Sequence, residues 1–199
     1  MRRFFGLLFI ALLALTPAAH AASLTSVKVT ETAQMPRARP DFPIPAEPNQ
    51  LFYLQRSTNS NTVIYAARFD SNGNLDARNP VAVYWRRYNT TGERKPLKRI
   101  EQMFAYGVNT GKRKTSGEFT LTIKPAAELP ILVRQTAPGK AEALATVGGR
   151  TVRLSYIYLT VDERGLVPRV THLAGYGIDI QSGRAISQTF AVSGGTIRP

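Results

Sequence analysis

Basic side chains are the most abundant groups in this sequence that could bind a ligand. Lysine and arginine number 26 against 13 aspartates and glutamates, which gives a formal net charge of +13. Tyr84, Trp85 and Tyr88 lie among these basic residues. A dense positive surface attracts phosphate and carboxylate groups. The sequence therefore predicts an anion-binding surface made by two nearby groups of basic residues: Arg86, Arg87, Arg94, Lys95, Lys98, Arg99, Lys112, Arg113 and Lys114.

A second interpretation of the same charge stays open. Long basic side chains are often fully solvated, and at physiological salt their charge is screened beyond ~8 Å. The basic residues would then add solubility and nothing specific. Basic residues with aromatic neighbours also suit single-stranded nucleic acid, but the export signal described below argues against nucleic acid as a physiological partner.

Nucleophilic catalysis finds little support in the residues present. A hydrolytic triad needs a nucleophile, a base and an acid that orients the base. His172 is the only histidine beyond the N-terminal signal, and it would need Ser155 or Ser187 as nucleophile and an acid such as Asp179. The Gly-x-Ser-x-Gly motif of a strained nucleophile turn is absent. We therefore interpret His172 as an ordinary strand histidine and assign no catalytic residue.

Paired carboxylates could hydrolyse a glycoside, one as acid and the other as base or nucleophile. The candidates are Glu101, Glu118, Asp162, Glu163 and Asp179. No spacing singles out a pair, so a carboxylate-dependent envelope hydrolase stays as the alternative function. For Glu101 we favour a structural role, because it lies beside the apolar face of a predicted helix and could pair there with Arg56 or Arg87.

Metal and cofactor sites are not indicated. The chain has no cysteine, and a single histidine beyond the signal disfavours zinc. Residues 70–76 (DSNGNLD) superficially resemble a calcium loop, but the glycine is fourth instead of sixth, and Val81 stands where a glutamate is needed. A tight turn is the better interpretation. Phosphate-loop and dinucleotide motifs are absent, so no cofactor is predicted.

Residues 1–21 have the pattern of a secretory signal peptide. Two arginines are followed by twelve apolar residues from Phe4 to Leu15, and Ala19-His20-Ala21 predicts cleavage after the last alanine. Twelve residues span roughly 18 Å as a helix, too short for a hydrocarbon core of about 30 Å. The sequence predicts a bacterial protein that is periplasmic or secreted, with no transmembrane segment after signal removal.

Residues 22–48 are predicted to form a Pro-rich extended arm or linker, partly disordered, ahead of a single β-rich domain at 49–195. Five of the thirteen prolines lie between residues 32 and 50. Proline lacks a backbone donor and fixes φ, which excludes a helix or a central strand here. Phe42 and Ile44 could pin the arm to a surface. Whether that surface belongs to this domain or to a partner stays open.

Alternating apolar residues and polar turns dominate the rest of the chain. The expected strands cover residues 51–55, 62–69, 81–88, 118–123, 129–133, 141–147, 151–161, 170–180 and 185–192. In the third of them, Val81, Val83 and Trp85 are expected to face the core. Eight to ten strands at roughly regular spacing predict a mainly β fold, an antiparallel β-sandwich or barrel.

One short helix is predicted at about 96–106. A proline suits its first turn, and Gly107 suits a C-terminal cap. Leu97, Ile100 and Phe104 have helical spacing and are expected to form the face that packs on the core. A further strand is the competing interpretation, because the end of the segment also suits one.

Several short motifs resemble a known bacterial family. They are Leu51-Phe52-Tyr53-Leu54-Gln55-Arg56-Ser57, Asn61-Thr62-Val63-Ile64-Tyr65, Asn79-Pro80-Val81, Tyr84-Trp85, Ile100-Glu101 and Phe104-Ala105-Tyr106-Gly107. Together they make residues 45–192 similar to the bacterial domain-of-unknown-function family 4833. The resemblance implies a secreted or envelope-associated domain. It implies no activity, and no catalytic residue can be carried over from it.

These observations favour a non-enzymatic binding or envelope-interaction module with a basic surface for anionic ligands. The expected partners are anionic envelope components (lipopolysaccharide, anionic lipid or peptidoglycan) or another envelope protein. A structural role in a larger assembly, through a sheet edge, is a third interpretation.

Overall fold

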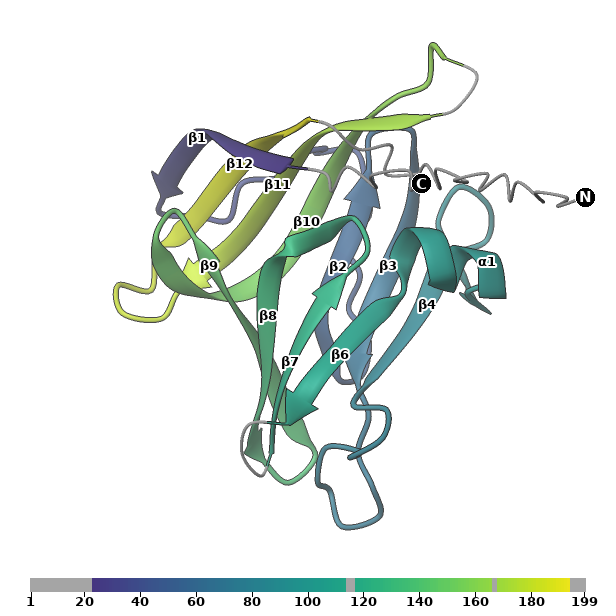
Figure 1. Ribbon diagram of the computed structural model, residues 1–199, viewed down its shortest axis with the longest axis vertical. Helices are drawn as coiled ribbons and strands as arrows, with labels where there is room; N and C mark the ends of the chain where they lie inside the picture. Colours follow the sequence, from purple (N-terminus) through teal and green to yellow (C-terminus); the bar gives the residue numbers. More distant parts are fainter. Residues whose placement is uncertain (1–22, 114–116, 166–167, 194–199) are drawn as a thin grey trace, which may run out of the picture.

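The computed structural model describes residues 23–113, 117–165 and 168–193 (Figure 1). The predicted signal peptide at 1–21 lies outside these residues, as does Lys114 of the predicted anion-binding set. For Lys112 and Arg113 of the same set, only the backbone is described.

The described chain is mainly β, with twelve strands and one short helix. The strands are β1 (Ser23–Thr32), β2 (Gln50–Arg56), β3 (Asn59–Ala67), β4 (Val81–Arg87), β5 (Glu93–Pro96), β6 (Val108–Arg113), β7 (Glu118–Ile123), β8 (Ala126–Ala137), β9 (Lys140–Val147), β10 (Arg150–Asp162), β11 (Arg169–Asp179) and β12 (Ala185–Ser193). Between β5 and β6, α1 (Arg99–Glu101) continues into the π-helical turn η1 (Gln102–Tyr106), which makes one helix of eight residues. The predicted mainly β class with one short helix is confirmed. The strands beyond the nine expected are β1, β5 and β6, whose sequences lack a sustained apolar alternation.

The sheet branches at β10. Along one edge, β10 pairs with β11, which is followed by β12 and β1. Along its other edge it pairs first with β9, at Arg150–Arg153, and then in parallel with β2, at Tyr156–Leu159. Two wings leave β10 at this change of partner, β9-β8-β7-β6 and β2-β3-β4-β5. The wings curl toward each other into a half-barrel, whose open side lies between β4 and β6 (Figure 1).

The main hydrophobic core fills the space between the two wings. Its largest side chains, each at most 2% exposed, come from both wings and include Phe52, Tyr65, Trp85, Leu121 and Ile131. Burial of such apolar side chains is the dominant favourable contribution to folding. The predicted inward face of β4 is confirmed, because Val81 and Trp85 are buried in this core and Val83 packs against it.

The Pro-rich segment that precedes β2 docks on its own domain, against the outer face of the second wing. The Tyr156 hydroxyl donates to the Pro36 carbonyl oxygen at 2.7 Å and accepts from the Ala38 N–H at 3.0 Å. Phe42 is buried, as expected of an anchor. Ile44 is 60% exposed, so the prediction that it also anchors the segment is wrong. The arm therefore covers β2 and β3, which explains why both faces of these strands are buried.

Residues 23–32 form β1, which the sequence analysis did not predict. β1 pairs antiparallel with β12 along its whole length. Its Glu31 also bridges to Arg150 at 3.0 Å and to Arg184 at 2.5 Å. The prolines of the arm begin only at Pro36, so the backbone before that point keeps the donors that a strand needs.

The helix is rotated relative to the sequence prediction. Leu97 is buried, but Ile100 is 63% and Phe104 59% exposed, so the predicted core face made by these three residues is wrong. Ala105 and Tyr106 are buried in their place. Polar contacts between the helix and β4, described below, fix the helix in this orientation.

Close packing between β10 and β11 predicts that Gly177 tolerates no side chain. A Cβ there would lie 2.4 Å from Val152 Cγ2 and 2.7 Å from the Arg153 carbonyl oxygen. We expect Gly177→Ala to lower the free energy of unfolding by about 1–3 kcal/mol through overpacking, measured by urea titration. Gly175→Ala on the same strand is the control, because its Cβ would meet only Val147 Cγ2, at 3.5 Å. Equal stability of the two variants would contradict this packing.

Candidate functional site

Six of the nine predicted anion-binding residues lie on β4, β5 and the start of the helix, but they do not form a single patch. In the β4–β5 ladder Trp85 lies opposite Lys95, and Arg86 lies opposite Arg94. Opposed residues of an antiparallel pair project to the same face, and successive residues project to opposite faces. Arg86 and Arg94 therefore share the outer face, whereas Arg87 and Lys95 share the inner face with Trp85.

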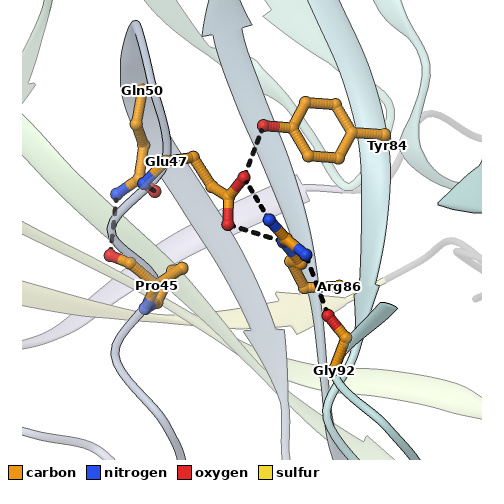
Figure 2. Close-up of polar contacts among 6 residues, drawn as sticks. All are labelled: Pro45, Glu47, Gln50, Tyr84, Arg86 and Gly92. Carbon is orange, nitrogen blue, oxygen red and sulfur yellow. Dashed lines mark hydrogen bonds and ion pairs between the residues drawn. The ribbon is translucent and has the colours of Figure 1, made fainter. Parts of the chain in front are cut away.

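On the outer face, Arg86 ties the Pro-rich segment to β4 (Figure 2). Its guanidinium donates to both carboxylate oxygens of Glu47, at 2.5 and 2.8 Å, and to the Gly92 carbonyl oxygen at 3.0 Å. The Tyr84 hydroxyl donates to the same carboxylate at 3.3 Å. The hydrogen bonds from Arg86 hold the pKa of Glu47 below its usual value, against the opposing effect of burial. The charge of Arg86 is thus compensated within the fold.

On the inner face, the Glu101 carboxylate joins the helix to β4. It accepts from the Trp85 indole N–H at 3.2 Å and from the Lys98 backbone N–H at 2.8 Å. Arg87 Nη2 lies 3.8 Å from its other oxygen, and the Arg87 guanidinium lies 4.5 Å from the centroid of the Trp85 ring. The prediction that Glu101 pairs with an arginine is confirmed, and the partner is Arg87. Glu101 therefore has a structural role that fixes the helix on the sheet.

Arg56 and Tyr106 form the buried side of the contact between the helix and β4. The Arg56 guanidinium lies 5.4 Å from the Trp85 ring centroid and 5.7 Å from that of Tyr106. Burial raises the pKa of Tyr106, and the charge of Arg56 opposes that rise. The Tyr106 carbonyl oxygen accepts from the Tyr65 hydroxyl at 2.9 Å, which ties the end of the helix to β3. These contacts leave the opposite side of the helix to solvent.

The solvent side of the helix combines apolar and basic side chains. Ile100, Met103 and Phe104 are 63%, 47% and 59% exposed, and their spacing places them on one helical face. Lys98 and Arg99 at the helix start are also exposed, as are Arg94 and Lys95 on the adjacent strand β5. We name the following residues the helix surface: Lys95, Lys98, Arg99, Ile100, Met103 and Phe104. Arg94 is not one of them, because it shares the outer face with Arg86.

Little of the positive charge of the helix surface is compensated. Lys95 bridges to Glu93 at 2.7 Å, but both side chains are about half exposed, and such pairs bind weakly. Arg94 lies apart from these residues, on the outer face, where it stacks on the Tyr84 ring at 3.8 Å from its centroid and its charge helps to lower the pKa of Glu47. Among the described residues, Lys98 and Arg99 have no ion-pair partner within 4 Å. Sequence reasoning found these basic residues but missed the apolar ones beside them, because it assigned Ile100 and Phe104 to the core.

The residues considered for a catalytic triad lie far apart. His172 is exposed on β11 and pairs in register with Ala191 of β12. Ser187 is four residues from Ala191 along that strand, or about 13 Å at roughly 3.3 Å per residue. Asp179 is seven residues from His172 along β11, or about 23 Å. The geometry therefore gives no support to a triad built on His172.

Three of the five carboxylates considered for a hydrolase, Glu101, Asp162 and Asp179, are engaged in ion pairs and turns. Asp162 pairs with Arg164 at 2.8 Å, and hydrogen bonds from this arginine lower the Asp162 pKa. Asp179 accepts from the Ser182 hydroxyl at 2.7 Å, which is the main cause of its own lowered pKa. A general acid in a glycosidase needs a raised pKa. No specific observation therefore favours the hydrolase alternative.

The segment 70–76 forms a tight turn, as predicted. The Asp70 carboxylate accepts from the backbone N–H groups of Asn72 and Asn74, at 2.8 and 2.9 Å, and Phe69 bridges to Leu75. Within residues 23–113, 117–165 and 168–193, no three His, Asp or Glu side chains are grouped closely enough to ligate a metal ion.

Replacing Glu101 is expected to release the helix from β4. Glu101→Ala leaves the Trp85 indole N–H and the Arg87 guanidinium without their shared acceptor, and a lost hydrogen bond to a charged group costs about 1.5–3 kcal/mol. Trp85 is the only tryptophan of the chain, so its fluorescence emission reports the change directly. We expect a red shift and a lower unfolding midpoint for Glu101→Ala, and smaller effects for Glu101→Gln. Unchanged emission in Glu101→Ala would contradict this role.

The Glu47–Arg86 contact is expected to make stability depend on pH. Because the folded-state pKa of Glu47 lies below its ordinary 4.5, the contact stabilises the protein fully above pH 4.5 and is lost as the pH falls through the folded-state pKa. Glu47→Gln should be less stable than the parent protein by about 1 kcal/mol at pH 7, and this difference should shrink toward pH 3. Urea titrations at both pH values measure it. Glu163→Gln, at an exposed position, should be as stable as the parent protein at both pH values. If the stability difference between Glu47→Gln and the parent protein does not change with pH, the Glu47–Arg86 contact is not the source of the pH dependence.

The comparisons with known proteins agree with the motifs noted in the sequence. A family model described as Domain of unknown function (DUF4833) matches residues 52–189, which run from β2 into β12. No curated protein and no solved structure matches the chain. Among the described residues, no helix is both long and apolar enough to cross a bilayer. Since the family model covers well over half of the sequence, the chain belongs to the DUF4833 family.

Proposed function

We propose that this protein is a non-enzymatic module that binds the anionic surface of a phospholipid bilayer in the bacterial envelope through its helix surface. The observation that carries the proposal is the exposure of Ile100, Met103 and Phe104 on one face of a helix, next to the basic side chains of Lys95, Lys98 and Arg99.

The apolar part of the helix surface is unusual for a solvent-facing helix. Seven large hydrophobic residues are exposed among the described residues, and three of them are the neighbours Ile100, Met103 and Phe104. Clustered exposed apolar side chains mark interaction sites. Amphipathic helices that lie in a membrane interface place such residues at the boundary between headgroups and acyl chains.

The charge of the helix surface selects an anionic membrane. Three cations, Lys95, Lys98 and Arg99, have one ion-pair partner among the described residues, which is Glu93 beside Lys95. Each basic residue near an anionic bilayer contributes about 1 kcal/mol of attraction. Arg86 and Arg87 of the predicted anion-binding set contribute less, because Glu47 and Glu101 lie against them. The proposal therefore narrows the nine predicted basic residues to three and adds three apolar ones.

The proposed location is the bacterial periplasm or the cell exterior. It rests on the signal-peptide pattern of residues 1–21. Export would bring the helix surface to an envelope membrane, where anionic phospholipid is available.

Vesicle binding tests the apolar part of the proposal. The full chain is mixed with vesicles of phosphatidylglycerol and phosphatidylcholine and sedimented. We expect Phe104→Ser to weaken binding about tenfold, since it removes a large apolar side chain from the interface. Ile180→Ser is the matched control, because Ile180 is also exposed, at 48%, and belongs to the turn between β11 and β12. This turn lies away from the helix (Figure 1). All variants carry the same residues 1–21, so any contribution of that segment cancels.

Charge neutralisation tests the electrostatic part in the same assay. Lys98→Gln combined with Arg99→Gln should weaken binding to phosphatidylglycerol vesicles about thirtyfold, since two basic residues contribute about 2 kcal/mol. Arg78→Gln combined with Lys140→Gln removes the same charge from other exposed positions and should have a much smaller effect. Equal losses for the two pairs would show nonspecific charge attraction. Binding to peptidoglycan or lipopolysaccharide but not to these vesicles would also overturn the proposal.

A further inference from the structure

A cavity opens at the side where the half-barrel is not closed. Its volume is about 560 Å³, and residues of β4, β6 and the helix line it. Figure 1 shows these elements around the open side of the half-barrel. β5 pairs with β4 only along Tyr84–Arg87, so the edge at Val81–Val83 has no strand partner among the described strands. The helix closes one end of this gap, where the Lys124 N–H donates to the Gly107 carbonyl oxygen at 3.2 Å. A side chain at Gly107 would collide with the Gln102 carbonyl oxygen, 1.9 Å from its Cβ, so this closure requires glycine.

The charged residues of the cavity are both basic. Arg68 and Lys124 line it, and no acidic residue does. In the described part of the chain, neither side chain has an ion-pair or hydrogen-bond partner. Asp76 lies near enough to Arg68 to feel its charge, but its carboxylate accepts from the backbone N–H groups of Arg78 and Asn79, at 2.8 and 3.0 Å. Two cations without an ion-pair partner in one cavity attract an anion.

The neutral polar residues of the cavity suit a ligand rich in hydroxyl groups. Asn79, Asn109 and Thr110 line it, and their side chains make no hydrogen bond within the described ranges. Gln102 also lines it and donates to the Leu97 carbonyl oxygen at 2.9 Å, which leaves its own side-chain oxygen as an acceptor. Amide side chains offer donors and acceptors together. The volume lies within the range of about 300–1,000 Å³ that small-molecule sites occupy.

We infer that this cavity binds a small, hydroxyl-rich anion, a sugar that carries a phosphate or a carboxylate group. Arg68 and Lys124 bind the anionic group, and the amide side chains bind the hydroxyls. The inference goes beyond the proposed membrane binding. The two sites use different charged residues, although Met103 belongs to the helix surface and also lines the cavity.

Isothermal titration calorimetry of the full chain tests the inference with three probes. Glucose 6-phosphate and glucuronate carry the two anionic groups, and glucose carries neither. We expect at least one of the two anions to bind at least tenfold more tightly than glucose, and their relative affinity identifies the anionic group. Absence of binding by both anions at millimolar concentration would overturn the inference.

Substitutions then test whether the anion binds in the cavity. Arg68→Gln and Lys124→Gln should each weaken anion binding at least fivefold. Arg78→Gln, in the loop next to the cavity but not lining it, should leave the affinity unchanged. Asn109→Tyr fills the cavity from the exposed edge of β6 without removing charge, and it should also abolish binding. Binding that survives all three cavity substitutions would overturn the inference. Phe104→Ser should keep anion binding, so failure of the membrane proposal and failure of this one are distinguishable.

Discussion

The carboxylate of Glu101 decides which side of the helix meets water. It takes hydrogen bonds from the Trp85 indole and the Lys98 amide and lies against Arg87. A helix of eight residues is too short to be stable alone, so its orientation is set by such tertiary contacts. With Glu101 directed at β4, Ala105 and Tyr106 face the core, and Ile100, Met103 and Phe104 face solvent. The helix surface is the direct result of this one constraint.

The neighbouring residues Arg86 and Arg87 allow β4 to hold a different segment on each of its two faces. Successive strand residues point to opposite faces, so each arginine meets a different carboxylate. Arg86 meets Glu47 and holds the Pro-rich segment on the outside, and Arg87 meets Glu101 and holds the helix on the inside. The helix then bridges the open side of the half-barrel between β5 and β6. The helix surface and the cavity between β4 and β6 therefore both depend on how the helix is fixed to β4.

The sequence predicted the parts of this arrangement that depend on local pattern. Period-two alternation identified β4 and its inward residues, and the place of Glu101 beside an apolar helix face predicted that it pairs with Arg56 or Arg87, of which the structure shows Arg87. The rotation of the helix could not be predicted, because Leu97, Ile100 and Phe104 have the spacing of a core face whether or not the core lies on that side. The cavity could not be predicted either, since Arg68 and Lys124 meet only through the curl of the whole sheet. The role of Glu47 could not be predicted for a similar reason, because its partner Arg86 is 39 residues away in sequence.

The most direct test of the central claim is hydrogen–deuterium exchange of the full chain, free and bound to phosphatidylglycerol vesicles. If Glu101 holds the helix so that its apolar face enters the membrane, exchange should slow in peptides that cover β5 and residues 98–104. Peptides from β1 and from the β11–β12 turn should keep their free rates. Slowing at β1 or over the Pro-rich segment, with none at the helix, would contradict this orientation and the membrane-binding role built on it.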